Sequence, residues 1–113
     1  MDKSIKLDVD FGVDRIKDTK APSNARIMLQ YIGYTVGLGY KEGLSSDKRR
    51  IWDAILRRIE DAVEKGLDSF TLNQYEYVFI KQAYEKAVAP ANEAKWVTAS
   101  ENAVLNAEDV QKA

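Results

Sequence analysis

The chain has 113 residues, with no cysteine and no histidine, and its 17 basic and 18 acidic side chains leave a net charge of −1. This balance excludes the strongly basic composition of a dedicated nucleic-acid-binding domain. The missing residue types exclude disulfides, thiolate metal sites and the commonest general base. With 45% apolar residues, the chain suits one domain with its own core. No signal peptide or membrane-spanning run is recognisable, so we expect a cytoplasmic protein.

The first expected element is a strand near the start of the chain. Four apolar residues alternate with polar ones there: Ile5, Leu7, Val9 and Phe11. An alternation of period two indicates a strand with one buried face. Gly12 ends the pattern, and residues 13–23 are polar, with Pro22 near their end. We therefore expect a loop or an irregular arm after the strand.

A helix over residues 24–42 is expected next, beginning at Ser23 or Asn24 as its cap. It is apolar around much of its circumference, which is typical of a central, buried helix. Gly33 and Gly37 lie four residues apart on one face, and we interpret them as a notch for close helix packing by analogy with small-residue motifs. The glycine-rich stretch lacks the Gly-Lys-Ser/Thr ending of a phosphate-binding loop.

Two further helices are expected over residues 46–65 and 74–89. The first has a continuous apolar face and opposite charges four residues apart on its exposed side. The second begins with Asn73 and Glu76 in the positions of a capping box. Between them, the apolar link 67–72 can pair as a short strand.

The last segment, residues 91–113, is rich in alanine and asparagine and contains few large apolar residues. It is either one more helix with a sparse apolar stripe or a loose tail anchored by Trp96. The sequence thus predicts a mainly α fold: a three-helix core with a short N-terminal strand in residues 1–90, followed by a C-terminal helix or tail in residues 91–113.

Basic residues concentrate on the helix expected over residues 46–65. Four of its arginines are candidate phosphate contacts: Arg49, Arg50, Arg57 and Arg58. However, the stretch from Ser45 to Gly66 contains six basic and five acidic residues, which favours a solvated, ion-paired helix. Phosphate binding is the alternative interpretation.

Aromatic residues are numerous for this length, with six tyrosines and two tryptophans. Tyrosine and tryptophan are enriched in protein interfaces. We expect four of them to be candidate interface residues: Tyr34, Tyr40, Tyr75 and Trp96. No nucleophile and base stand in a recognisable catalytic arrangement, and no metal or cofactor motif is present. The sequence therefore predicts a non-enzyme without a cofactor.

The order of elements from Ile51 to Val88 is a charged amphipathic helix, Glu-Lys-Gly, an apolar Ser-Phe-Thr-Leu segment and a capped aromatic helix. This layout resembles that of small accessory proteins of tailed bacteriophages. The resemblance implies a small oligomeric partner protein, either a virion or assembly component or an inhibitor of a host system. It also implies a location in the bacterial host cytoplasm or the virion.

The N-terminal strand adds an argument for self-association. Its only expected partner within the chain is the segment around Phe70, and an isolated two-stranded pair is marginal in water. A strand from another molecule would complete it. We therefore expect a homo-oligomeric interaction or assembly protein; the alternatives are a nucleic-acid-associated regulator using helix 46–65 and an inhibitor that docks on a host enzyme.

Overall fold

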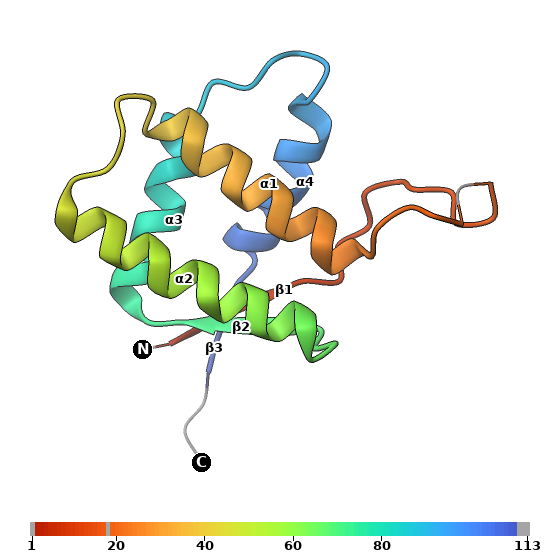
Figure 1. Ribbon diagram of the computed structural model, residues 1–113, viewed down its shortest axis with the longest axis horizontal. Helices are drawn as coiled ribbons and strands as arrows, with labels where there is room; N and C mark the ends of the chain where they lie inside the picture. Colours follow the sequence, from red (N-terminus) through yellow and green to blue (C-terminus); the bar gives the residue numbers. More distant parts are fainter. Residues whose placement is uncertain (1, 18, 111–113) are drawn as a thin grey trace.

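The computed structural model describes residues 2–17 and 19–110, which form four helices and a three-stranded sheet (Figure 1). The helices are α1 (Asn24–Gly39), α2 (Ser46–Glu64), α3 (Gln74–Lys86) and α4 (Ala94–Leu105), and the strands are β1 (Lys3–Lys6), β2 (Ser69–Leu72) and β3 (Glu108–Asp109). The mainly α prediction is confirmed. Of the two alternatives for the C-terminal segment, the helix is correct.

Local capping explains where three of the helices begin. The side chains of Ser23 and Ser45 accept hydrogen bonds from backbone N–H groups in the first turns of α1 and α2. At α3, Asn73 Oδ1 accepts from the Glu76 N–H and Glu76 Oε1 accepts from the Asn73 N–H, both at 2.9 Å. This is the predicted capping box. The helices end one to three residues before their predicted ends; α3 stops at Lys86 because the next residue is already extended.

The sheet has the strand order β2-β1-β3, and both pairings are antiparallel. Ile5 lies opposite Phe70 on one side of β1, and Lys3 lies opposite Asp109 on the other. The sequence predicted only the first of these pairings. Strand β1 has a neighbour on each side within the chain. It therefore does not need a strand from another molecule to complete its pairing, contrary to the sequence-based expectation.

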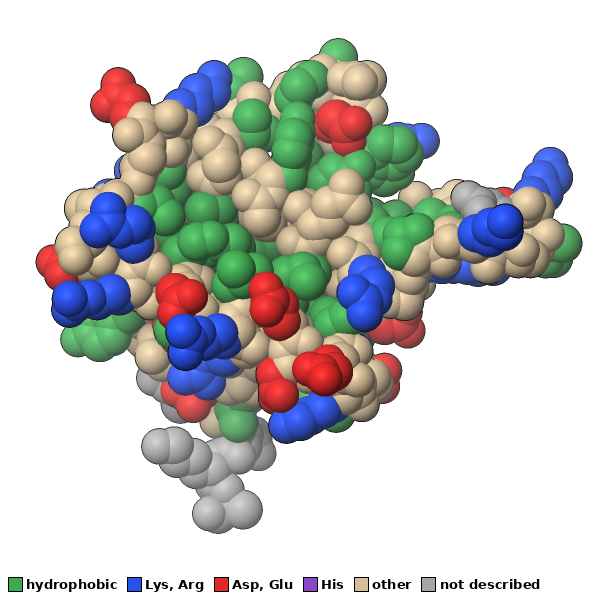
Figure 2. All heavy atoms as spheres, viewed as in Figure 1, with side chains coloured by type: hydrophobic (Ala, Val, Ile, Leu, Met, Phe, Trp, Pro, Cys, Tyr) green, Lys and Arg blue, Asp and Glu red, His purple; other side chains and the backbone are tan. Residues whose placement is uncertain are grey.

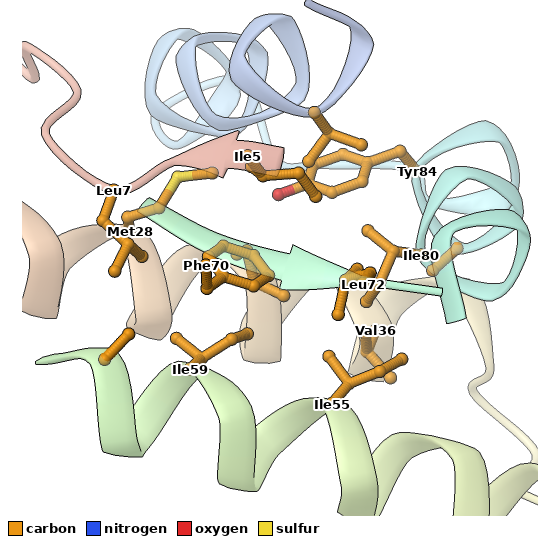
Figure 3. Packing of buried hydrophobic residues seen from close by; sticks show 14 of the residues in the cluster. Ile5, Leu7, Met28, Val36, Ile55, Ile59, Phe70, Leu72, Ile80 and Tyr84 are labelled. Atoms are coloured by element: carbon orange, nitrogen blue, oxygen red, sulfur yellow. The ribbon is translucent and has the colours of Figure 1, made fainter. Parts of the chain in front are cut away.

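The core lies between the sheet and the helices, and α1 and α3 form its most extensive helix contact. Figure 3 shows side chains from both long strands meeting those of the helices around one interior. The fully buried large side chains at its centre include Ile5, Leu7, Met28, Ile55, Ile59, Leu72 and Ile80.

Helix α4 belongs to this same core. Val97 and Val104 are buried, and the hydroxyl of Tyr84 in α3 donates to Ser100 Oγ at 2.7 Å. Burial raises the pKa of Tyr84 to about 12. Since α4 packs on α1 and α3 and β3 pairs with β1, the segment after residue 90 completes the domain rather than extending from it.

The predicted glycine notch differs from what the structure contains. A Cβ atom added at Gly33 would make an ordinary contact with Trp52, 3.9 Å away, and one added at Gly37 would meet nothing within 4 Å. A Cβ atom at Gly39 would instead lie 2.5 Å from the carbonyl oxygen of Ala83 in α3. The closest helix approach therefore occurs at Gly39, at the C-terminal end of α1.

Candidate interaction site

The most prominent surface feature is a loop that leaves the body between β1 and α1 (Figure 1). We call residues 12–22 the arm. Gly12, with φ of +74°, turns the chain outward, and its N–H donates to Asp10 Oδ1 at 2.8 Å. Ile16 on the arm is 91% exposed, more than any other large apolar side chain in the described residues. Figure 2 shows basic side chains on the arm and an apolar side chain at its outer end.

Aromatic side chains fix the point where the arm begins. The ring of Tyr31 in α1 lies 5.9 Å, between centroids, from those of Phe11 and of Trp96 in α4. Trp96 Nε1 donates to the Phe11 carbonyl at 3.2 Å, and the Tyr31 hydroxyl donates to Glu93 Oε2 at 2.7 Å. Burial, followed by this hydrogen bond, raises the pKa of Tyr31 to about 12. Phe11, the residue before Gly12, is thus held in place by side chains of α1 and α4.

An arginine closes the arm on itself. The guanidinium of Arg15 donates to the carbonyl oxygens of Ala21, at 2.9 Å, and Pro22, and to Asn24 Oδ1 at 2.8 Å. Asn24 Nδ2 in turn donates to Asp8 Oδ1 at 3.1 Å. The planar, multiply donating guanidinium suits this role. The outgoing and returning segments of the arm are therefore connected near its base.

The tip of the arm contains an Asp-centred turn. Asp14 Oδ1 accepts from the backbone N–H groups of Ile16, at 3.0 Å, and Lys17, at 3.2 Å. Such turns fix the local chain direction. Together with the Arg15 contacts, this turn presents Ile16 to solvent on a structured loop.

A hollow of about 700 Å³ lies beside the base of the arm. Its walls come from the arm, the start of α1 and the segment at the end of α2, and include Asp8, Ala21, Ala25, Val63, Leu67 and Asp68. Leu67 is 50% exposed. The hollow therefore combines apolar surface with two carboxylates.

Two of the four candidate interface aromatics, Tyr34 and Trp96, lie beside the same Tyr31 ring, whereas Tyr40 and Tyr75 lie elsewhere. Trp96, predicted as a candidate interface residue, is half-buried at the root of the arm. Tyr34 stands edge-on to Tyr31 at 6.1 Å, and Tyr75 is 80% exposed on α3. No single aromatic surface unites them.

Tyr40 packs inward for a different reason. Its ring stacks on Phe79 of α3, with centroids 5.1 Å apart and an interplanar angle of 10°. The ammonium groups of Lys48 and Lys86 lie 5.0 and 4.8 Å from the ring centroid. Burial raises the pKa of Tyr40. This residue therefore helps join α1, α2 and α3.

Ion pairs involve two of the four candidate phosphate-binding arginines. Arg57 contacts Asp53 at 3.1 Å, and Arg58 contacts Glu76 at 3.2 Å. The Glu76 side chain is nearly buried. Arg49 donates a long hydrogen bond to the Leu44 carbonyl, at 3.5 Å, and Arg50 is exposed. The arrangement fits the ion-paired interpretation of this helix better than a phosphate-binding face.

Sequence reasoning missed Ile16, although a local signal exists. Ile16 is the only large apolar residue between Val13 and Pro22, in a run that is otherwise polar or charged. The polar run predicts a loop, and hydrophobic periodicity assigns no role to a single apolar residue within it. A lone isoleucine in such a run indicates a contact made outside the chain or a buried anchor, and only the structure separates the two.

In residues 2–17 and 19–110, no three histidine, cysteine or carboxylate side chains gather as a metal ion would require. No helix of the same residues is both long and apolar enough to cross a bilayer. Comparison of the chain with models of known protein families, with curated proteins and with solved structures finds no match, so the site is interpreted from its own geometry.

Proposed function

We propose that this chain is a non-catalytic protein–protein interaction protein that contacts its partner through the arm. The observation that carries the proposal is the 91% exposure of Ile16 on a loop tied at its root and its base. Burying apolar surface contributes about 25 cal/mol per Å². A preorganised loop also loses little conformational entropy on binding.

The length of the connection supports a functional role. The connection from β1 to α1 spans 17 residues, 7–23, and its described residues, 7–17 and 19–23, contain no helix or strand. Loops longer than about 12–15 residues are uncommon in compact domains and are usually either functional or disordered linker segments. A plain connection would need neither the Arg15 contacts nor the aromatic root.

Combined with the resemblance to tailed-phage accessory proteins, the arm favours a homo-oligomeric structural or assembly protein. We propose the virion or the bacterial host cytoplasm as its location. An inhibitor that docks on a host enzyme would use the same arm. A nucleic-acid-associated regulator receives less support, because Arg57 and Arg58 already contact carboxylates.

Site-specific photo-cross-linking tests the proposal. A benzoylphenylalanine replaces Ile16 in the full chain, and a matched control carries it at Val88, which is 75% exposed in the link between α3 and α4. We expect one discrete adduct from position 16, identified by mass spectrometry, and none from position 88. The same probe at Lys20 should lose its adduct when Ile16→Asp is added. Absence of an adduct at position 16, or equal adducts from both sites, would refute the proposal.

A further inference from the structure

The hollow adjoins the base of the arm, since Ala21 of the arm forms part of its wall. The arm itself projects from one end of the molecule (Figure 1). Building on the function proposed above, we infer that the partner is a second copy of this chain. Ile16 of each copy enters the hollow of the other, and Lys17 and Lys20 approach Asp8 and Asp68 there.

Twofold symmetry would pair both arms with both hollows, so that no arm or hollow is left for a third copy. The hollow lies beside the base of the arm, and Ile16 is exposed to solvent and does not line that hollow. A twofold axis passing between arm and hollow carries each arm over the other copy's hollow. Both contacts then form at once, as an isologous interface requires. No further copies are recruited, so the product is a dimer.

The two surfaces are complementary in polarity. The arm sequence, residues 12–22, has three basic and two acidic residues, a net charge of +1. In the hollow, Asp8 and Asp68 outnumber the single Arg15, whose guanidinium already binds carbonyl oxygens. The C-terminal end of α2 also borders the hollow and contributes partial negative charge. Ile16, with Lys17 and Lys20 on the same arm, suits this combination.

The apolar part of the hollow fits the tip of the arm. Ala25, Val63 and Leu67 provide apolar wall, and the hollow of about 700 Å³ is open to solvent on one side. Ile16 with its two neighbouring lysine stems therefore has room. Because only two short arms are exchanged, the interface is smaller than a standard stable one, and we expect a dissociation constant on the order of 1–100 µM.

The first experiment measures the solution mass of the full chain by sedimentation equilibrium from about 1 to about 500 µM at low salt. The mass should rise from 12.8 kDa toward twice that value. Ile16→Asp should weaken association about 100-fold, since symmetry removes two anchors and each is worth about tenfold. The matched control Val88→Asp should associate like the unmodified chain. Circular dichroism checks that each variant keeps its helices.

The second experiment tests the hollow by complementation. Leu67→Arg blocks the hollow and should also give a monomer; Asp68→Lys replaces it if Leu67→Arg fails to fold. Mixing Ile16→Asp with the hollow variant should restore a weaker dimer. One copy then offers an intact hollow and the other an intact arm.

Each outcome decides the inference. A chain that stays at 12.8 kDa at the highest concentration overturns the second-copy assignment, whereas an adduct between position 16 and a different protein would still support the arm as a contact site. A dimer unaffected by Ile16→Asp overturns both. A dimer lost in Ile16→Asp but kept in both Leu67→Arg and Asp68→Lys overturns the role of the hollow and points to arm-to-arm contact.

Discussion

Replacing Gly39 by alanine adds one methyl group at the closest contact between α1 and α3. The added Cβ would lie 2.5 Å from the Ala83 carbonyl oxygen, 3.0 Å from its Cα and 3.1 Å from its carbonyl carbon. All three are backbone atoms, so no side chain can rotate away. Ordinary contact begins at 3.4 Å, and the two helices must therefore move apart by about 0.9 Å, which disturbs close packing on both sides.

The expected cost follows from that displacement. Overpacking a well-packed interior costs about 1–3 kcal/mol, and alanine returns at most about 1 kcal/mol of helix propensity. Gly39 does not have a positive φ, so alanine adds no backbone strain. We expect a net loss of about 1–2 kcal/mol in the free energy of unfolding. At Gly37, where an added Cβ meets nothing, alanine should instead gain up to about 1 kcal/mol.

Urea unfolding followed by circular dichroism measures both variants against the unmodified chain. Thermal unfolding gives a second estimate, since a change of 1 kcal/mol shifts the Tm of a chain this long by about 4 °C. Gly39→Ala should lower the midpoint and Gly37→Ala should raise it. If the two substitutions shift stability equally, or if Gly39→Ala stabilises, the close approach of α1 to α3 is not as described.

Three further changes test other parts of the structure. Burial raises the pKa of Tyr84 from 10.0 to about 12. The stability that the neutral Tyr84 hydroxyl contributes is therefore complete below pH 10 and is lost as the pH rises through 12, with a loss of about 1.4 kcal/mol at pH 11. Between pH 8 and pH 11, urea unfolding should show a smaller decline in the free energy of unfolding for Tyr84→Phe than for the unmodified chain. Arg15→Ala should speed trypsin cleavage after Lys17 by about tenfold while changing the unfolding free energy by less than about 0.5 kcal/mol; an unchanged cleavage rate would show that the arginine does not hold the arm. Deleting residues 94–113 removes two buried valines and strand β3. The free energy of unfolding should fall by about 3–6 kcal/mol, which approaches the whole stability of a small domain, so cooperative unfolding should be abolished. A truncated chain with an unchanged unfolding midpoint would contradict this.

The sequence predicts helix starts well because the interactions that create them are local. Ser45 precedes α2 directly, and Asn73 and Glu76 stand three residues apart, so both caps are visible in the sequence. The strand that pairs with the second side of β1 has no such local signal in the sequence. Strand β3 is two acidic residues more than 100 positions away, with no alternation or β-branched residue to indicate a strand. Only the packed fold brings it to β1.

The same distinction explains the errors at the candidate site. Trp96 stands in a segment with few apolar neighbours in sequence, which suggested exposure, yet its hydrogen-bond acceptor is the carbonyl of a residue 85 positions earlier. The glycine pair Gly33 and Gly37 indicates one face of α1, but the backbone contact is made by Gly39, which lies on a different face of the helix. Periodicity identifies surfaces; it does not identify their partners.

The contrast between the two ends of the arm argues against a passive loop. At its root, two helices position one backbone carbonyl through Tyr31 and Trp96, and near its base Arg15 spans the outgoing and returning chain. None of these contacts is needed to join β1 to α1, and they leave Ile16 in water, where an apolar side chain gains nothing. A rigid support beneath an exposed apolar tip lowers the entropic cost of binding and has no comparable benefit for folding. The arrangement therefore supports the proposed contact outside the single chain, for which the hollow beside the arm offers apolar wall and two carboxylates.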